Sequence, residues 1–290
     1  MPMKIERHVM PVLTICVGVL LLWYAACIPM NAVVAETKIA DLGGGFSNTL
    51  AVSWGLDRPV IPAPHQVLTE IWNSVFLVAP WKVKSLLFHI WVTLTSTMLG
   101  FVMGTLLGIG LAVAIIHSKL LNKSLMPWII ASQTIPILAI APMIIGVLGS
   151  VGFTGLIPKS LISMYLCFFP VAIGMVKGLT SPDPMQLDLM RTYNASAAQI
   201  LWKLRFPAAM PFLFTSLKVA IAIALTGAIV GELPTGAQGG LGARMLAGSY
   251  YGQTIQIWAA LVAASVVAAS LVYAIAGMER VVNVRMGARP

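Results

Sequence analysis

SPDPMQLDLMRTYNASAAQILWKLRFPAAMP, residues 181–211, is a long polar connection in an otherwise apolar chain. Asp183 followed by a proline predicts a helix N-terminus, because Asp caps the first free amides and proline loses nothing at the first helical position. Met185, Leu189 and Tyr193 then recur at helical spacing. A short amphipathic helix is therefore expected here.

Asn194 interrupts this pattern, and asparagine tolerates the left-handed backbone of a tight turn. A second helix is expected after the turn, because apolar residues recur at i, i+3, i+4 and i+7. These residues are Ala197, Ile200, Leu201 and Leu204. Pro207 is expected to close the second helix. Two short helices that are apolar on one side predict a loop that docks in a groove of another protein.

The composition places the rest of the chain in a membrane. Of the 290 residues, 59% are hydrophobic and only 9% are charged, whereas about 25% charged residues are usual in soluble proteins. The net charge of +9 would also fit a nucleic-acid-binding protein. The basic residues are not clustered with aromatic residues on a polar face, so a membrane topology explains them better.

Six charge-poor runs are long enough for helical membrane spans. They cover residues 12–28, 85–116, 124–158, 160–176, 212–230 and 255–276. The alternative for the first run is a cleaved signal peptide, because Val33, Val34 and Ala35 resemble a cleavage site. Its apolar core exceeds the roughly 7–15 residues of a signal peptide, so a retained span is favoured. We therefore expect an all-α membrane protein of about six spans.

Residues 181–211 resemble the cytoplasmic loop of permease subunits from bacterial ABC importers. The family pattern is Glu-Ala-Ala, three residues, Gly, nine residues, then Ile-x-Leu-Pro, and this chain keeps the spacing with different residues. The matching or adjacent positions are Asp188, Leu189, Met190, Asn194, Ala195 and Pro207. The resemblance implies a coupling helix that sits on an ATP-hydrolysing partner. The alternative is a surface helix pair without a partner.

Two further resemblances to this family suggest pathway or gate residues. A proline-alanine-proline pattern in residues 133–142 places Gln133, Thr134 and Pro136 near the pathway, although these polar groups would equally serve as contacts between helices. Glu232 followed by Gly239-Gly240-Leu241-Gly242 resembles the family's connection between its last two spans, where a gate or a contact to the partner subunit is expected.

Lys218 lies about seven residues into its span, roughly 10 Å along the helix. It is expected to reach the cytoplasmic interface with its ammonium group, and a counter-ion for substrate is the alternative.

The expected organisation has four parts. Residues 1–30 hold the tail and first span, 31–84 a periplasmic segment with a short amphipathic helix at 66–76, 85–280 the permease core with the coupling loop at 177–210, and 281–290 a cytoplasmic tail. With both termini inside, twelve Lys and Arg residues lie inside and six outside. The positive-inside rule therefore favours both termini in the cytoplasm and a bacterial inner-membrane location.

Several smaller patterns allow either a structural or a functional interpretation. Gly100, Gly104 and Gly108 give one helix face a small-residue groove, for internal packing or for dimerisation. His65 and Trp72 are read as interfacial anchors rather than ligands. The cysteines are expected to be small core residues, not a disulfide or metal site. They are Cys16, Cys27 and Cys167.

The sequence contains no Gly-x-x-x-x-Gly-Lys-Ser/Thr motif and no visible catalytic constellation, so no nucleotide is expected to bind through that loop. The resemblance implies a type I importer permease, closest to the nitrate, sulfonate and taurine branch, which also includes relatives for pyrimidine-like heterocycles. It implies no cofactor in this chain, ATP and Mg on a partner subunit, a second permease copy in a homodimer, and a periplasmic binding protein. The alternatives are an ion-coupled secondary transporter and a membrane-embedded enzyme.

Overall fold

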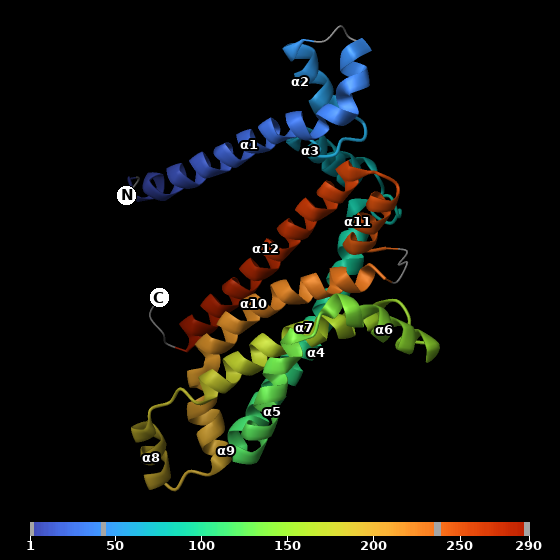
Figure 1. Cartoon of the computed structure of the whole chain (residues 1–290). Helices are drawn as coiled ribbons and strands as arrows, with labels where there is room; N and C mark the ends of the chain where they lie inside the picture. Colours follow the sequence, from blue (N-terminus) through green and yellow to red (C-terminus); the bar gives the residue numbers. More distant parts are fainter. Residues whose placement is uncertain (1–2, 42–44, 235–238, 287–290) are drawn as a thin grey trace. The chain divides into compact units, whose positions relative to one another are not determined.

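The computed structural model describes residues 3–41, 45–234 and 239–286, and the regular structure in these ranges is helical (Figure 1). The helices are α1 (Met3–Asp41), α2 (Phe46–Gly55), α3 (Pro64–Trp72), η1 (Asn73–Leu77), α4 (Leu86–His117), α5 (Lys119–Ala131), η2 (Ser132–Thr134), α6 (Ile137–Ser150), α7 (Leu156–Leu179), α8 (Pro184–Thr192), α9 (Ala197–Ile200), η3 (Leu201–Arg205), α10 (Phe206–Glu232), α11 (Leu241–Tyr250) and α12 (Thr254–Arg285). Within the described ranges five helices are long and apolar enough to cross a membrane, and a bent pair raises the number to six. The expectation of an all-α protein with about six spans is confirmed.

The span that includes α10 begins earlier than its sequence pattern predicts. Residues 197–232 form one continuous span of 36 residues, so Pro207 does not end the helix that precedes it. Pro207 lies in the first turn of α10, directly after the π-turn of η3. A π-turn rearranges the local hydrogen bonds, and the missing amide of proline is therefore accommodated without a break in the helix.

The chain divides into two compact units, and each is described by itself. The first unit comprises Met1–Phe88 and Arg244–Ala263. Its centre is Asn31, which is fully buried. The Asn31 amide donates to the carbonyls of Ser53 and Ile61, both at 2.9 Å, and its oxygen accepts from the amide of Val60 at 2.8 Å. One side chain of α1 thus fixes the extended segment that follows α2.

Aromatic and ionic contacts complete the first unit. The rings of Trp23 and Trp258 lie 5.0 Å apart. His65 stacks on Tyr24 and lies at hydrogen-bond distance from its hydroxyl, 3.2 Å. The Arg244 guanidinium binds the Glu70 carboxylate at 2.9 Å. His65 therefore has a packing role within the unit.

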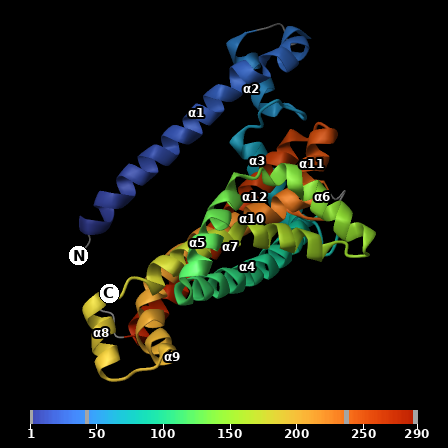
Figure 2. The ribbon, with the colours of Figure 1, turned by 60° about the horizontal axis from the view of Figure 1, so that its bottom comes forward.

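The second unit comprises His89–Ala243 and Ala264–Pro290. Within it α7 and α10 lie side by side, as Figures 1 and 2 both show. Buried side chains of α4, α7, α10 and α12 form one apolar core, which includes Phe101, Val171, Met175, Ile221 and Ile275. A smaller cluster joins α5 to α4 and α7.

The glycine groove of α4 serves internal packing, the first of its two predicted roles. A β-carbon at Gly100 would lie 2.6 Å from the Ser160 carbonyl, and one at Gly104 would lie 2.2 Å from the Cys167 sulfur. At Gly108 it would lie 2.8 Å from the Phe168 carbonyl. The backbones of α4 and α7 therefore approach each other closely only because these positions carry no side chain.

The three cysteines are free thiols. Cys27 and Cys167 are buried, as expected for small core residues. The same expectation is wrong for Cys16, which is exposed. Its neighbours on α1, such as Ile15 and Val17, are also exposed and apolar, so this stretch has the character of a lipid-facing surface and not of a protein core.

We predict that Gly108→Ala destabilises the protein and that Gly110→Ala does not. The new methyl group at 108 would overlap the backbone of α7, and overpacking of this kind costs about 1–3 kcal/mol. A β-carbon at Gly110 meets nothing within 4 Å. Thermal unfolding of the detergent-solubilised variants, followed by tryptophan fluorescence, measures the difference. Equal melting temperatures for the two variants would contradict the close approach of α4 and α7.

Candidate functional site

The first part of the candidate site is α8, whose start is fixed by local hydrogen bonds. The Asp183 carboxylate accepts from the amide of Met185 at 2.8 Å, and the Gln186 side chain accepts from the amide of Asp183 at 3.3 Å. This reciprocal arrangement is a capping box. It confirms Asp183 as the N-cap, and bonds between near neighbours fix the start of the helix.

The turn after α8 has the conformation predicted from Asn194. This residue has a φ of 52°, the only positive φ among the described residues other than glycine. The amides of Asn194 and Ala195 donate to the carbonyls of Arg191 and Met190, at 2.8 and 3.0 Å. Ser196 then caps α9, again with a reciprocal bond from Gln199. The loop is therefore a preformed helix–turn–helix.

One face of α8 is apolar and exposed. Met185, Leu189 and Tyr193 follow at four-residue intervals and are 79%, 57% and 78% exposed. Asp188 lies beside this stripe and pairs with Arg191 at 3.0 Å. Met190 is half-buried on another face of the helix. We call Met185, Leu189 and Tyr193 the apolar stripe, and an exposed stripe of this kind fits a groove on another protein.

Arg205 links the two ends of this loop, a role that no sequence pattern indicated. Its guanidinium donates to the carbonyl of Leu179 at 3.0 Å. Leu179 is the last residue of α7, where carbonyl groups lack helical partners. The two ends of the loop are therefore linked by a hydrogen bond, and α8 lies beside α9 at the tip of the loop (Figure 2).

The second part of the site is the break between α5 and α6. The two helices are bent by 99° at this point. Pro136 caps α6, and Gln133, Thr134 and Pro136 are all exposed. The hydroxyl of Tyr165 donates to the carbonyl of Ser132 at 2.6 Å, which ties the break to α7. The structure thus places the three predicted pathway residues together at a bend.

The third part surrounds Glu232 and consists of four buried side chains from three helices. We call His89, Thr93, Lys159 and Glu232 the polar clasp, and each is at most 6% exposed. The Thr93 hydroxyl donates to the Glu232 carboxylate at 2.8 Å and accepts from the amide of Leu241 at 2.8 Å. The Lys159 ammonium donates to the carbonyl of Gly239 at 3.2 Å.

The polar clasp holds the glycine-rich segment 239–242 by its backbone. The amide of Gly242 donates to Glu232 at 2.8 Å, and that of Gly240 donates to His89 Nδ1 at 3.0 Å. Gly240 has a φ of +124°, and a β-carbon there would lie 2.2 Å from the Glu232 carboxyl carbon. Only glycine allows this approach. The Glu232 carboxylate is thus hydrogen-bonded by groups of its own chain. The sequence pattern that could have indicated its partners is the presence of polar residues, such as Thr93, in the otherwise apolar α4.

Lys218 has a partner that the sequence did not suggest. Its ammonium pairs with the Glu279 carboxylate of α12 at 2.5 Å, and both side chains are largely buried, at 32% and 20% exposed. The pair joins α10 to α12 within the second unit. Because Lys218 is paired with Glu279, its charge is balanced within the chain and no substrate is needed as its counter-ion.

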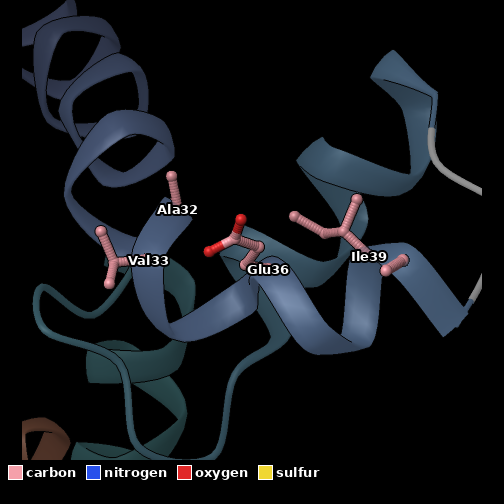
Figure 3. Close-up of a pocket in the computed structure, with 5 residues that line it drawn as sticks. Ala32, Val33, Glu36 and Ile39 are labelled. Atoms are coloured by element: carbon pink, nitrogen blue, oxygen red, sulfur yellow. The ribbon is translucent and has the colours of Figure 1, made fainter.

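Two of the surface hollows formed by the described residues have volumes of about 490 Å³ each. One lies between α7 and α10 and is mostly apolar, with Lys177 at its edge. The other lies on α1, where Figure 3 shows the Glu36 carboxylate among Ala32, Val33 and Ile39. Among the described residues no three His, Cys, Asp or Glu side chains gather as a metal site would require. Neither hollow combines the groups of a catalytic centre.

Comparison with known proteins relates these features to a family. The family described as "Binding-protein-dependent transport system inner membrane component" matches residues 100–287. A probable ABC transporter permease of Haemophilus influenzae is 32% identical over 70% of this chain and 77% of its own length.

The formylaminopyrimidine transport permease of Halalkalibacterium halodurans is 29% identical over 68% of this chain and 76% of its own length. The riboflavin transport permease of Chloroflexus aurantiacus is 29% identical over 76% of this chain and 77% of its own length. Permeases named for aliphatic sulfonates, nitrate and taurine also match.

Replacement of the clasp carboxylate by Glu232→Ala should lower the free energy of unfolding by about 3 kcal/mol. The substitution leaves the Thr93 hydroxyl and the Gly242 amide buried without their acceptor and removes the negative charge near the Lys159 ammonium. Glu232→Gln should cost less, because one acceptor oxygen remains. Chemical or thermal unfolding measures both, with the exposed Glu36→Ala as control. A melting temperature of Glu232→Ala equal to that of the control would contradict the clasp.

The pair between α10 and α12 can be tested by a double-mutant cycle. Lys218→Met and Glu279→Gln should each destabilise the protein. The double variant should lose less than the sum of the two, with an interaction energy of about 0.5–3 kcal/mol. Unfolding of the three variants in detergent provides the cycle. Strict additivity would mean that the two groups do not interact.

Proposed function

Because the chain belongs to the family of binding-protein-dependent transport system inner membrane components, we propose that its α8–α9 loop couples it to a separate ATP-hydrolysing subunit. The chain is a transmembrane permease subunit of an ATP-driven importer, a membrane protein that forms a translocation pathway for a small solute. The single observation that supports the proposed coupling is the apolar stripe of α8, which is exposed on a preformed helix.

The stripe has the character of a docking helix. Apolar residues at four-residue spacing insert into a groove when a helix binds another protein. The capping box at Asp183 and the turn at Asn194 order α8 before it docks. Little conformational entropy is therefore lost on binding, which strengthens the contact. ATP and Mg are held by the partner in this proposal, and the chain itself needs no cofactor.

Each matched residue of the loop receives a defined role. Leu189 makes the docking contact, and Asp188 offers its charge at the rim of the stripe. Asn194 and Ala195 set the angle between α8 and α9 through the turn. Met190 packs against the rest of the loop, and Pro207 starts α10, so that any movement of the loop is passed directly into a membrane span.

The remaining partners follow from the same family membership. We infer a second copy of this chain as the other half of the pathway, in a homodimer, and a periplasmic binding protein that delivers the solute. The excess of twelve inner over six outer Lys and Arg residues supports an inner-membrane orientation with both termini in the cytoplasm. The α8–α9 loop then lies on the side where ATP is available.

The relatives indicate a small solute and divide into two chemical groups. Two of them are named for heterocycles, formylaminopyrimidine and riboflavin. Others are named for nitrate, sulfonates and taurine. A pyrimidine-like heterocycle or a small anion of the nitrate, sulfonate or taurine kind is accordingly the proposed cargo. Gln133, Thr134 and Pro136 are the proposed pathway residues, whereas Lys218 and Glu232 act on the pathway through the helices that they hold.

We predict that Leu189→Glu uncouples ATP hydrolysis from transport. A buried charge without a partner is costly, so docking should weaken and solute uptake should fall by roughly ten-fold or more. Transport and ATPase activity of the complete complex in proteoliposomes are the measurements. Thr180→Ala is the control, because this exposed hydroxyl bonds only to carbonyls of α7.

The result for Leu189→Glu decides between a docking helix and a surface helix without a partner. Loss of uptake together with loss of the ATPase response to the loaded binding protein supports docking. Uptake equal to that of Thr180→Ala would rule out a coupling role for the stripe.

A further inference from the structure

The break between α5 and α6 lies deep in the apolar part of the chain. Gln133 follows Lys119, at the start of α5, by about 14 residues, or roughly 20 Å of helix. The hydrocarbon core of a bilayer is about 30 Å thick. If α5 enters the membrane near its basic first turns, the break lies well inside the hydrocarbon region and not at its edge.

The non-helical backbone at the break is not compatible with direct contact with lipid. Ile135 and Pro136 are extended, with φ and ψ of −78° and 121° and of −67° and 107°. Non-helical backbone at membrane depth is tolerated only where it is covered by protein or lines a water-filled cavity. Gln133, Thr134 and Pro136 are exposed in the single chain. The break must therefore face either protein outside this unit, such as a second copy, or the pathway.

The polar groups offered at the break are neutral. The hydroxyl of Thr134 donates to the carbonyl of Ala131 at 2.8 Å. Within the part of the chain that the structure describes, the Gln133 amide makes no hydrogen bond. A glutamine amide carries a donor and an acceptor side by side. Gln133 thus matches an adjacent donor and acceptor on a planar solute.

None of the three lysines of α7 and α10 offers its charge at the break. Lys159 belongs to the polar clasp and interacts electrostatically with Glu232. Lys218 pairs with Glu279. Lys177 is exposed, but it follows Tyr165, which bonds the break, by 12 residues, or roughly 18 Å of helix. An anion at the break would meet an amide and not one of these cations, and a poorly compensated charge inside a membrane is costly.

We propose that the α5–α6 break lines the translocation pathway and that Gln133 binds an uncharged, planar solute through an amide-like edge of the kind found on pyrimidines. This rests on the proposed function, because a pathway requires the second permease copy. Of the two chemical groups of cargo, it selects the uncharged heterocycle. Gln133 is then a specificity-determining residue of the membrane subunit, in addition to the selection made by the binding protein.

The first test identifies the solute. The tagged chain is purified from native membranes with its partners, the bound solute is released by denaturation, and mass spectrometry determines its structure. An uncharged heterocycle with a neighbouring donor and acceptor is the expected result. Nitrate, a sulfonate, taurine or another ion would overturn the proposal, although an associated ATPase would still leave the coupling proposal standing.

The second test addresses Gln133 itself in the reconstituted complex, with the binding protein used as purified in its loaded form. Gln133→Leu should lower uptake roughly ten-fold, as expected for one lost hydrogen bond, and Gln133→Asn should lower it less. Ser150→Ala is the matched control, because this exposed hydroxyl, at the far end of the adjoining helix α6, bonds only to the Val147 carbonyl. Wild-type uptake by Gln133→Leu would overturn the proposal.

The location of the break is tested without knowledge of the solute. Gln133→Cys, in a chain that carries Cys16→Ser, should react with a membrane-impermeant maleimide in the assembled complex, and solute-loaded binding protein should slow the reaction. Lack of reaction would show that the break is covered by protein. The ATPase response to the binding protein should persist in all Gln133 variants. If the wild-type complex itself showed no ATPase response to the binding protein, the proposed function would be contradicted, and not only the role of Gln133.

Discussion

Backbone amides and carbonyls find no water in a hydrocarbon layer, so a membrane chain must bond them internally. The long helices of this chain meet that requirement, and the few interruptions show how it is met elsewhere. At the α5–α6 break the hydroxyl of Tyr165 bonds the carbonyl of Ser132. At the end of α7 the guanidinium of Arg205 bonds the carbonyl of Leu179. In the segment 239–242, Thr93, Glu232 and His89 bond three consecutive backbone amides. Most polar side chains of these helices therefore support the backbone, which makes the exposed Gln133 unusual.

The span from α9 to α10 connects the two ends of the second unit. Its 36 residues measure roughly 54 Å at 1.5 Å per residue. One end continues directly from the α8–α9 loop, and the other ends at Glu232 in the polar clasp. Because α10 packs closely along α7, a movement of the proposed coupling loop would act on a helix that is supported along its length. The hydrogen-bond pattern of this span changes at the π-turn of η3 and at Pro207 and Pro211, which lack amide hydrogens.

Local features of this fold were predictable from the sequence, and long-range ones were not. The cap at Asp183 and the turn at Asn194 depend on neighbouring residues alone, and charge-poor runs indicate that the spans exist but not where each one begins. The passage of the helix through Pro207 depends on a π-turn, which no simple periodicity indicates. The pairing of Lys218 with Glu279 and the convergence of His89, Thr93 and Lys159 on residues 239–242 join segments 61 to 151 positions apart. Only the packing of whole helices brings such residues together.

The contacts also separate a stiff part of the second unit from a compliant one. The glycine face of α4 lies against α7, α7 lies against α10, and Lys218 joins α10 to α12. Shifting any of these helices alone would separate close backbones or a buried ion pair. The bent pair is held less tightly, since α5 meets its neighbours through a small cluster around Ile115, Ile129 and Ala172. The bend of 99° between these two short helices lies at the extended residues Ile135 and Pro136, outside the main core. The Tyr165 hydroxyl and the contacts of α6 with α7 and α10 hold it. A movement of the proposed pathway would therefore have to break few contacts at the bend, where the exposed amide of Gln133 lies.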